Sequence, residues 1–249
     1  MTEQIKVPNN LNEVVSMGKN AGSVTSWGSK VKRIFVTMFT GVLTFALMSS
    51  GVHAQTNQDP YGLVGNEKET REALLESGVD EADLDKLIAK LKRGEELDSM
   101  KSNKAIDVEL GEGKTSKVTK FPDGSAIKLA KEPEVSGINP LGCWSGYCQY
   151  TEKVYVYSYP SNGSYYAKYT TVKGGYDEIN SVWGGSTRSI GGSTENKVGP
   201  KISIKKESSS RWARAYMSWD WVAYSGVYSK NYTLRFFVGK NTCKESLVQ

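Results

Sequence analysis

The sequence predicts a mainly β protein, with a C-terminal antiparallel β-sandwich or open barrel preceded by a small α+β segment. Three observations predict this fold class. From residue 142 onward, apolar and polar residues alternate in several short runs, which is typical of strands with one buried face. Glycine-rich turns separate these runs. The clearest 3.6-residue periodicity, which marks an amphipathic helix, lies upstream, in residues 80–93.

A signal peptide with an extended n-region is predicted over residues 1–54. Three basic residues precede an apolar run of 15 residues, 34–48, and Val52 and Ala54 then place small residues at positions −3 and −1. The run is short for a membrane span, which needs about 20 residues. We therefore expect cleavage after Ala54 and a secreted product, with translation starting at Met1 or at Met17.

The single histidine, His53, precedes the expected cleavage site, so the mature chain would contain no histidine. Histidine is the usual general base near neutral pH and the commonest metal ligand. Its absence excludes Ser-His-Asp triads, Cys-His dyads and imidazole-based zinc sites. We expect no catalytic residue, no metal and no cofactor, and hence a protein that is not an enzyme.

The mature chain changes character along its length. Residues 55–136 hold 13 Lys/Arg and 18 Asp/Glu, a net charge of −5, whereas residues 137–249 hold 14 and 7, a net charge of +7. The C-terminal part also holds 13 of the 14 tyrosines and five of the six tryptophans. After a disordered linker over 55–66, we therefore expect an acidic α+β segment over 67–136 and a basic, aromatic-rich β-domain over 137–249.

Two helices and three short strands are expected in the acidic segment. The first helix covers residues 67–77 and the second 80–93, where four apolar residues share one face, namely Leu84, Leu87, Ile88 and Leu91. The strands cover three ranges, 105–110, 117–121 and 125–130. Pro122-Asp123-Gly124 should form the turn between the last two, because proline presets φ and glycine permits positive φ.

The β-domain alternates in five longer runs, over residues 152–159, 164–172, 200–207, 211–224 and 231–238. Between residues 172 and 200, three glycine pairs should mark turns that separate short pieces. These pairs are Gly174-Gly175, Gly184-Gly185 and Gly191-Gly192.

Residues 71–125 carry a resemblance. The pattern joins Arg71-x-x-Leu74-Leu75-x-x-Gly78-Val79 to Leu87-Ile88-x-Lys90-Leu91-x-x-Gly94-Glu95-x-x-Asp98-Ser99-Met100, and ends in Phe121-x-Asp123-Gly124-Ser125. It resembles the N-terminal half of uncharacterised secreted proteins of Gram-positive bacteria, actinobacteria especially. The C-terminal halves of those proteins are also rich in Tyr and Trp and contain cysteine. The resemblance implies location and architecture, and no activity.

The three cysteines, Cys143, Cys148 and Cys243, all lie in the β-domain. In an oxidising compartment two should pair and one should be left over. Cys143–Cys148, the favoured pairing, would close a short loop that presents Trp144 and Tyr147 outward as candidate binding residues. Either residue paired with Cys243 would instead tie the ends of the domain together. If Cys243 is left over, it stays buried or dimerises the protein, which is otherwise a monomer.

The aromatic residues are the candidate binding groups. Tyr155, Tyr157 and Tyr159 share one face of their strand. Trp219 and Trp221 lie on a different strand, the run 211–224. Such side chains beside lysine and arginine suit sugar rings, anionic wall polymers or a membrane interface. Core packing and cross-strand pairing are the alternative explanation of the same pattern. Nucleic acid is not expected, because the chain is exported and the positive charge is modest.

Three hypotheses follow. The first is a secreted, non-enzymatic protein whose β-domain binds a cell-wall polymer, a glycan or a membrane surface of the cell envelope. The second is an antibacterial or toxin-like effector silenced by contact with residues 55–136 acting as an inhibitory pro-region, and both removal and retention of this segment on maturation stay open. The third is a carboxylate-only hydrolase, for which Asp220, between two tryptophans, is the leading acid.

Overall fold

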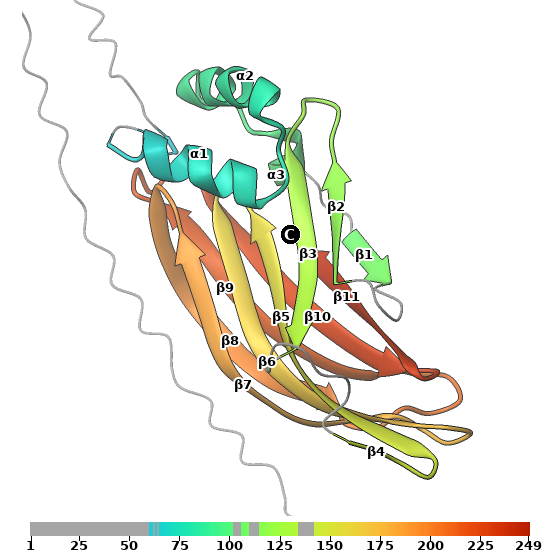
Figure 1. Ribbon diagram of the computed structural model, residues 1–249. Coiled ribbons are helices and arrows are strands. Elements are labelled where there is room, and N and C mark those ends of the chain that lie inside the picture. Colours follow the sequence, from blue (N-terminus) through green and yellow to red (C-terminus); the bar gives the residue numbers. More distant parts are fainter. Residues whose placement is uncertain (1–59, 62, 64, 102–105, 110–114, 134–141) are drawn as a thin grey trace, which may run out of the picture. The chain divides into compact units, whose positions relative to one another are not determined.

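The computed structural model describes residues 60, 61, 63, 65–101, 106–109, 115–133 and 142–249 (Figure 1). They belong to one compact unit, His53–Gln249. The predicted signal peptide, its cleavage site and most of the predicted linker lie outside the described residues.

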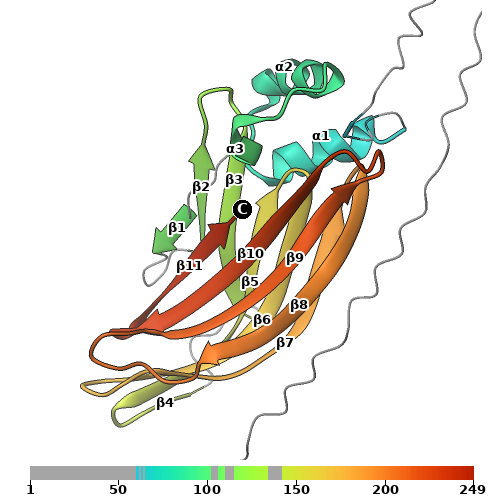
Figure 2. The same ribbon diagram turned by 180° about the vertical axis from the view of Figure 1, so that it is seen from behind.

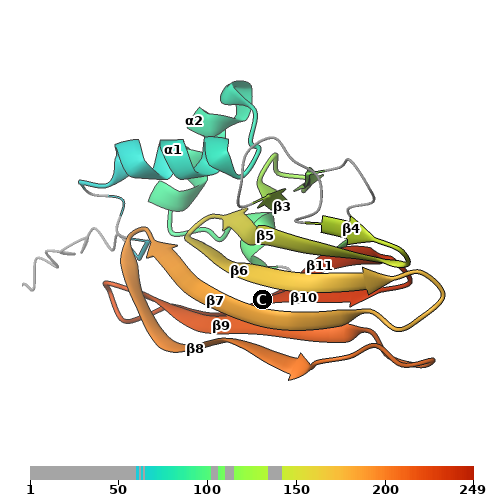
Figure 3. The same cartoon turned by 60° about the horizontal axis from the view of Figure 1, so that its bottom comes forward.

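Two antiparallel sheets lie face to face, which confirms the predicted fold class (Figures 1 and 3). The five-stranded sheet has the order β1-β11-β10-β9-β8. Its strands are β1 (Ile106–Glu109), β8 (Gly192–Ile204), β9 (Ala213–Ala223), β10 (Ser229–Gly239) and β11 (Thr242–Val248). The six-stranded sheet has the order β2-β3-β5-β6-β7, and β4 pairs with β5. Its strands are β2 (Ser116–Lys120), β3 (Ala126–Pro133), β4 (Gly142–Trp144), β5 (Tyr147–Ser158), β6 (Ser161–Val172) and β7 (Glu178–Ser189).

Three helices lie at one end of the sandwich, and β4 lies towards the other (Figures 1 and 2). They are α1 (Glu67–Glu76), α2 (Glu81–Lys92) and the short α3 (Asp98–Lys101). Both predicted helices are confirmed to within one residue at each end. The predicted apolar face of α2 is also confirmed, because all four of its leucine and isoleucine residues are buried.

The turn before β3 attaches the helices to the six-stranded sheet. Asp123 accepts hydrogen bonds from Lys90 Nζ at 2.7 Å and from the backbone N–H of Asp98 at 2.8 Å. Ser125 Oγ accepts one from the backbone N–H of Ser99 at 3.0 Å. Gly124 has φ +92°, as the predicted Pro-Asp-Gly turn requires. The turn prediction is therefore confirmed, and its aspartate also anchors α2 and the start of α3.

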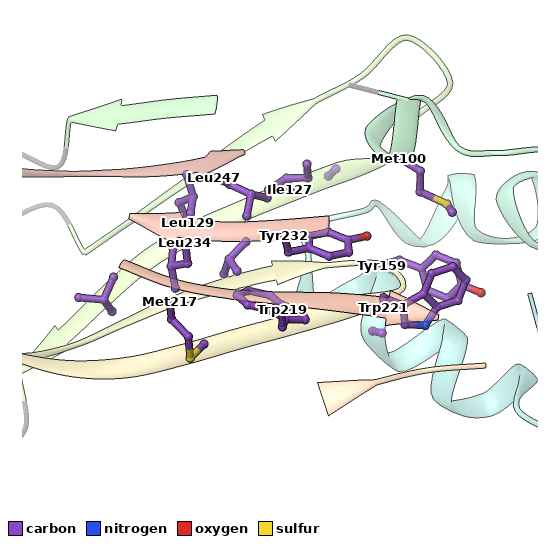
Figure 4. Packing of buried hydrophobic residues seen from close by; sticks show 14 of the residues in the cluster. Met100, Ile127, Leu129, Tyr159, Met217, Trp219, Trp221, Tyr232, Leu234 and Leu247 are labelled. Atoms are coloured by element: carbon purple, nitrogen blue, oxygen red, sulfur yellow. The ribbon is translucent and has the colours of Figure 1, made fainter. Parts of the chain in front are cut away.

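One continuous core fills the space between the sheets and under the helices. Trp219 and Trp221 are among the largest of its fully buried side chains, and Figure 4 shows them beside Tyr232 and Tyr159, respectively. The Trp219 indole stacks on the Tyr232 ring with centroids 5.6 Å apart and donates a hydrogen bond to Ser161 Oγ on the opposite sheet at 2.9 Å. The core therefore joins the two sheets through both packing and a buried hydrogen bond.

The boundary expected between residues 136 and 137 does not separate two cores. Strand β3 lies between β2 and β5, and β1 pairs with β11, so the segment 67–136 contributes strands to both sheets. Buried residues of the helices belong to the same core cluster as those of the strands. The difference in charge and aromatic content between the two parts therefore reflects position within one unit. Whether residues 55–136 act as a pro-region stays a prediction.

The glycine-rich stretch 172–200 differs most from expectation. It contains most of two long strands, β7 and β8, instead of short pieces between turns. Gly184, with φ +65°, lies at a register shift between β6 and β7, so this glycine pair bends a strand without ending it. Gly174 and Gly191 do lie in tight connections between strands. Strands β4 and β11 were not predicted, because one is short and the other lacks clear alternation.

Candidate ligand-binding face

The outer surface of the six-stranded sheet carries aromatic and basic side chains. Along β5, the buried Val154 and Val156 point into the core, so their neighbours Tyr155 and Tyr157 point outward. Strand β6 follows the same rule, with Tyr166 outward between two buried residues. We call this surface the outer tyrosine face, and it comprises Lys128, Lys153, Tyr155, Tyr157, Ser164, Tyr166, Lys168, Trp183 and Arg188.

A pocket of about 180 Å³ opens on the outer tyrosine face. Strands β5, β6 and β7 form its floor, and the end of α1 forms one wall through Glu76. Side chains of three chemical kinds line it: aromatic rings, cations and hydroxyl or amide groups. They are Lys153, Tyr155, Tyr157, Asn162, Ser164, Ser186, Thr187 and Arg188.

The two pocket tyrosines are held in fixed orientations. Their rings meet edge to face with centroids 5.1 Å apart. Lys153 lies over the Tyr155 ring at 6.0 Å, and Lys128 over the Tyr157 ring at 5.7 Å. The Tyr155 hydroxyl donates a hydrogen bond to Glu132, and burial together with this carboxylate raises the pKa of Tyr155. The tyrosine therefore stays neutral at physiological pH and presents the edge of a neutral ring.

The charged rim of the pocket is only partly neutralised. Arg188 pairs with Glu76 at 3.6 Å, and both side chains are more than two-fifths exposed. At that exposure the pair is weak, and the guanidinium remains available to an incoming anion. Asn162 is fixed differently, because its Oδ1 accepts the backbone N–H of Ser158 at 2.8 Å. The pocket thus has a fixed wall at Asn162 and an exchangeable cation, Arg188, whose weak partner Glu76 could be replaced by an anion of a ligand.

A second aromatic pair extends the face beyond the pocket. Tyr166 and Trp183 are paired across β6 and β7, and their rings stack with centroids 5.7 Å apart. Trp183 is 37% exposed, so part of its ring faces solvent. Sequence analysis missed Trp183 as a candidate because the following Gly184-Gly185 was interpreted as a turn. The alternation Tyr166-x-Lys168 in the neighbouring strand was the available signal.

The disulfide hairpin forms a separate aromatic site at the opposite end from the helices. Cys143 and Cys148 are bonded across the β4–β5 hairpin, as the favoured pairing predicts. Trp144 and Tyr147 stack at 5.2 Å and are 55% and 43% exposed. The expected outward display of both rings is therefore observed, and their role in binding stays a prediction. Cys243 is free and buried, so a dimer linked through its sulfur would require this strand to open.

Three of the aromatic candidates lie in the core. Trp219, Trp221 and Tyr159 are each at most 1% exposed, so they cannot contact a ligand on the folded surface. Trp221 also donates its indole N–H to the carbonyl of Ile190 at 3.1 Å. For these three positions the alternative explanation, core packing, accounts for the pattern. Of the three predicted tyrosines, Tyr155, which is 8% exposed, and the more exposed Tyr157 line the pocket.

Asp220, the leading acid of the hydrolase hypothesis, has a surface environment that favours its ionised form. Asp220 lies on the outer surface of the five-stranded sheet, and its side chain accepts hydrogen bonds from Asn231 and Asn196 that lower its pKa. A lowered pKa disfavours a general acid.

Among the residues that the structure describes, no group of three or more His, Cys, Asp or Glu could hold a metal ion. Within the same part of the chain, no helix is long and apolar enough to cross a membrane.

Comparisons with known proteins give one structural match. No family model matches the chain, and no curated protein matches it. Among solved structures, it is similar to the hypothetical protein lmo2686 of the Gram-positive bacterium Listeria monocytogenes EGD-e, with 23% sequence identity and a TM-score of 0.30. The match covers 53% of this chain and 97% of that chain. That protein has no assigned activity.

Proposed function

We propose that this protein is a secreted, non-enzymatic binding protein that holds an anionic glycan of the cell envelope on the outer tyrosine face. The pocket lined by Tyr155, Tyr157, Lys153 and Arg188 is the observation that carries the proposal. Its ligand would continue along the strands to the stacked Tyr166 and Trp183, which extend the same surface.

The chemistry of the face suits an acidic sugar polymer. Aromatic rings pack against the C–H faces of sugars, while hydroxyl and amide groups bond to sugar hydroxyls. Four cations lie on the face, Lys128, Lys153, Lys168 and Arg188, and they outnumber the carboxylates beside it, Glu76, Glu132 and Glu178. The excess positive charge supports attraction to phosphate or carboxylate groups. Such attraction between exposed groups weakens as salt is added.

Co-sedimentation of the mature protein tests the proposal. The probes are purified peptidoglycan, walls with and without their teichoic acid, and liposomes, each at low and at physiological salt. We expect binding to teichoic-acid-bearing walls that falls with salt, and less binding after Arg188→Gln, which removes the exchangeable cation. Equal binding of wild type and R188Q, or binding to none of the probes at low salt, would contradict it.

A second candidate function is insertion of the hairpin tip into a lipid interface. It is favoured by the exposure of Trp144 and Tyr147, since tryptophan and tyrosine prefer the boundary between headgroups and hydrocarbon. The liposome arm of the same experiment separates it from glycan binding. Trp144→Ala should abolish liposome binding and leave wall binding unchanged if both sites act. Unchanged liposome binding by W144A would remove this candidate.

The effector hypothesis finds less support. In the form in which maturation removes residues 55–136, the hypothesis conflicts with the position of β3, which comes from this segment and lies between β2 and β5 in the six-stranded sheet. Removing it would leave an unpaired edge on β5 and open the shared core.

A further inference from the structure

A cluster of polar side chains lies between the sheets, apart from the outer tyrosine face. Lys131 of β3 donates hydrogen bonds to Glu152 Oε1 of β5 at 3.3 Å and to Cys243 Sγ of β11 at 3.1 Å. Tyr169 of β6 donates to Glu152 Oε2 at 3.0 Å. The Lys131 and Glu152 side chains are only 12% and 13% exposed. The cluster thus holds an amine and a carboxyl group together in a region of restricted water access.

A further acid, Glu245, lies close enough to this cluster for the charges of Lys131 and Glu152 to act on it. Glu245 lies two residues after Cys243 on the same face of β11 and is completely buried. Neither of its carboxyl oxygens has a hydrogen-bond partner among the described residues. Burial raises the pKa of Glu245 to about 8. The positive charge of Lys131 lowers this pKa, and the negative charge of Glu152 raises it. Glu245 is therefore a neutral carboxylic acid at neutral pH, able to donate a proton and to take one back.

An unpartnered buried carboxyl group costs stability, so its presence needs a physical reason. The buried ion pair beside it also has a cost, because desolvation opposes the attraction between the charges. Both costs would have a reason if Lys131 and Glu152 reacted with each other and the neutral Glu245 supplied a proton to that reaction.

We propose that Lys131 and Glu152 form an intramolecular amide bond between β3 and β5, assisted by Glu245. The ammonium group of Lys131 passes one proton to the Glu152 carboxylate, and the freed Nζ attacks Cδ of Glu152. A C–O bond of the intermediate breaks as Glu245 protonates the departing hydroxyl group, which leaves as water. The nitrogen then returns a proton to Glu245. One ammonium and one carboxylate become one neutral amide and one water molecule, and no oxidant is needed.

The strand register places the two groups suitably. Lys131 pairs with Val154 and Pro133 with Glu152, so Lys131 and Glu152 are diagonal neighbours on the inner face of adjacent strands. Tyr169 and Cys243 bond the carboxyl and amine groups, respectively, and so hold them in place. Held in contact in this way, the two groups react as an intramolecular pair. The product exchanges two partly buried charges for a neutral amide and closes residues 131–152, which include the disulfide hairpin, into a ring.

Intact-mass measurement of the reduced, mature protein tests the proposal. We expect a mass lower than the sequence mass by one water molecule, and a peptide in which the segments containing Lys131 and Glu152 are joined. Lys131→Arg is the matched control, because it keeps the positive charge but cannot form this amide, and it should show the full sequence mass.

Glu245→Gln tests the role of the acid while keeping its shape. If E245Q retains the far-ultraviolet circular dichroism of the wild type, its linked fraction should be at least tenfold smaller after the same incubation. Cys243→Ser should keep the link, since it removes only a hydrogen-bond partner of the amine. A wild-type mass equal to the sequence mass would overturn the proposal. So would a Lys131–Cys243 bridge, which peptide mapping of the unreduced protein would reveal as a gain of one oxygen with loss of two hydrogens.

Discussion

Tyr166 and Trp183 stack across two neighbouring strands on the solvent side of the six-stranded sheet, with ring centroids 5.7 Å apart. The pair continues a surface that begins with Tyr155 and Tyr157 in the pocket, so aromatic rings from three adjacent strands lie on one face. Trp219 and Trp221, by contrast, are buried in the core, whereas Trp144 and Tyr147 form a separate exposed pair on the disulfide hairpin. The protein therefore uses its aromatic residues both in the core and on the surface, and the outer tyrosine face is the surface set that lines the pocket.

Asp123→Asn should destabilise the fold in a pH-dependent way. Burial alone would raise the pKa of Asp123, but hydrogen bonds from Lys90, Ser125 and Asp98 lower it from 3.8 to about 2. A carboxyl group with a lowered pKa stabilises the fold fully above its unfolded pKa and loses this contribution as the pH falls through the folded value. The shift corresponds to about 2 kcal/mol.

Urea denaturation at several pH values checks this prediction. The difference in unfolding free energy between wild type and D123N should be largest at neutral pH and should shrink between about pH 4 and pH 2. Lys120→Met serves as the control, because its salt bridge to Asp80 is exposed and should contribute little. A difference that does not change with pH would contradict the assignment.

Gly163→Ala should destabilise the core. A Cβ atom at this position would lie 2.3 Å from the ring of Trp219, and the ring is locked by its stacking on Tyr232 and its hydrogen bond to Ser161. Overpacking of this kind costs about 1–3 kcal/mol. Thermal unfolding, followed by tryptophan fluorescence, should show a lower Tm for G163A, whereas Ser164→Ala on the outer face should change it little. Equal Tm values would show that Trp219 can move.

The fragment 137–249 should not fold alone. It lacks β1, β2 and β3 together with all three helices, so β5 and β11 would each have an unpaired edge and the core would be open. We expect a fragment without near-ultraviolet circular dichroism and with strong binding of a hydrophobic dye. A cooperative unfolding transition in this fragment would instead support two separable units and would revive the pro-region hypothesis.

Much of the fold follows from local sequence patterns. The apolar face of α2, the Pro122-Asp123-Gly124 turn and the alternation in β9 and β10 are local signals, and all three predict what is observed. Division into two units was predicted from composition, yet composition does not report strand pairing. The contact between β3 and β5, and that between β1 and β11, join segments far apart in the sequence.

Only part of the candidate site was predicted, because local patterns do not report which surfaces become covered in the fold. Alternation separates the two faces of β5, but it does not reveal which face is covered. Tyr159 is on the predicted face yet is buried near the helices, whereas Tyr155 and Tyr157 reach the pocket. The approach of Lys131 to Cys243 brings together residues 112 positions apart, and no local pattern marks it.

Wall binding by two matched variants tests the central claim most directly. Trp183→Ala removes an aromatic ring from the outer tyrosine face, and Tyr216→Ala removes a partly exposed ring from the outer surface of the other sheet, where Lys201 lies over it at 5.4 Å. Each stacked ring contributes about 1 kcal/mol, or roughly a fivefold change in affinity. We predict that W183A binds teichoic-acid-bearing walls about fivefold more weakly than the wild type, while Y216A binds them equally well. Equal affinity of W183A and the wild type, or a loss confined to Y216A, would contradict a binding site on the outer tyrosine face.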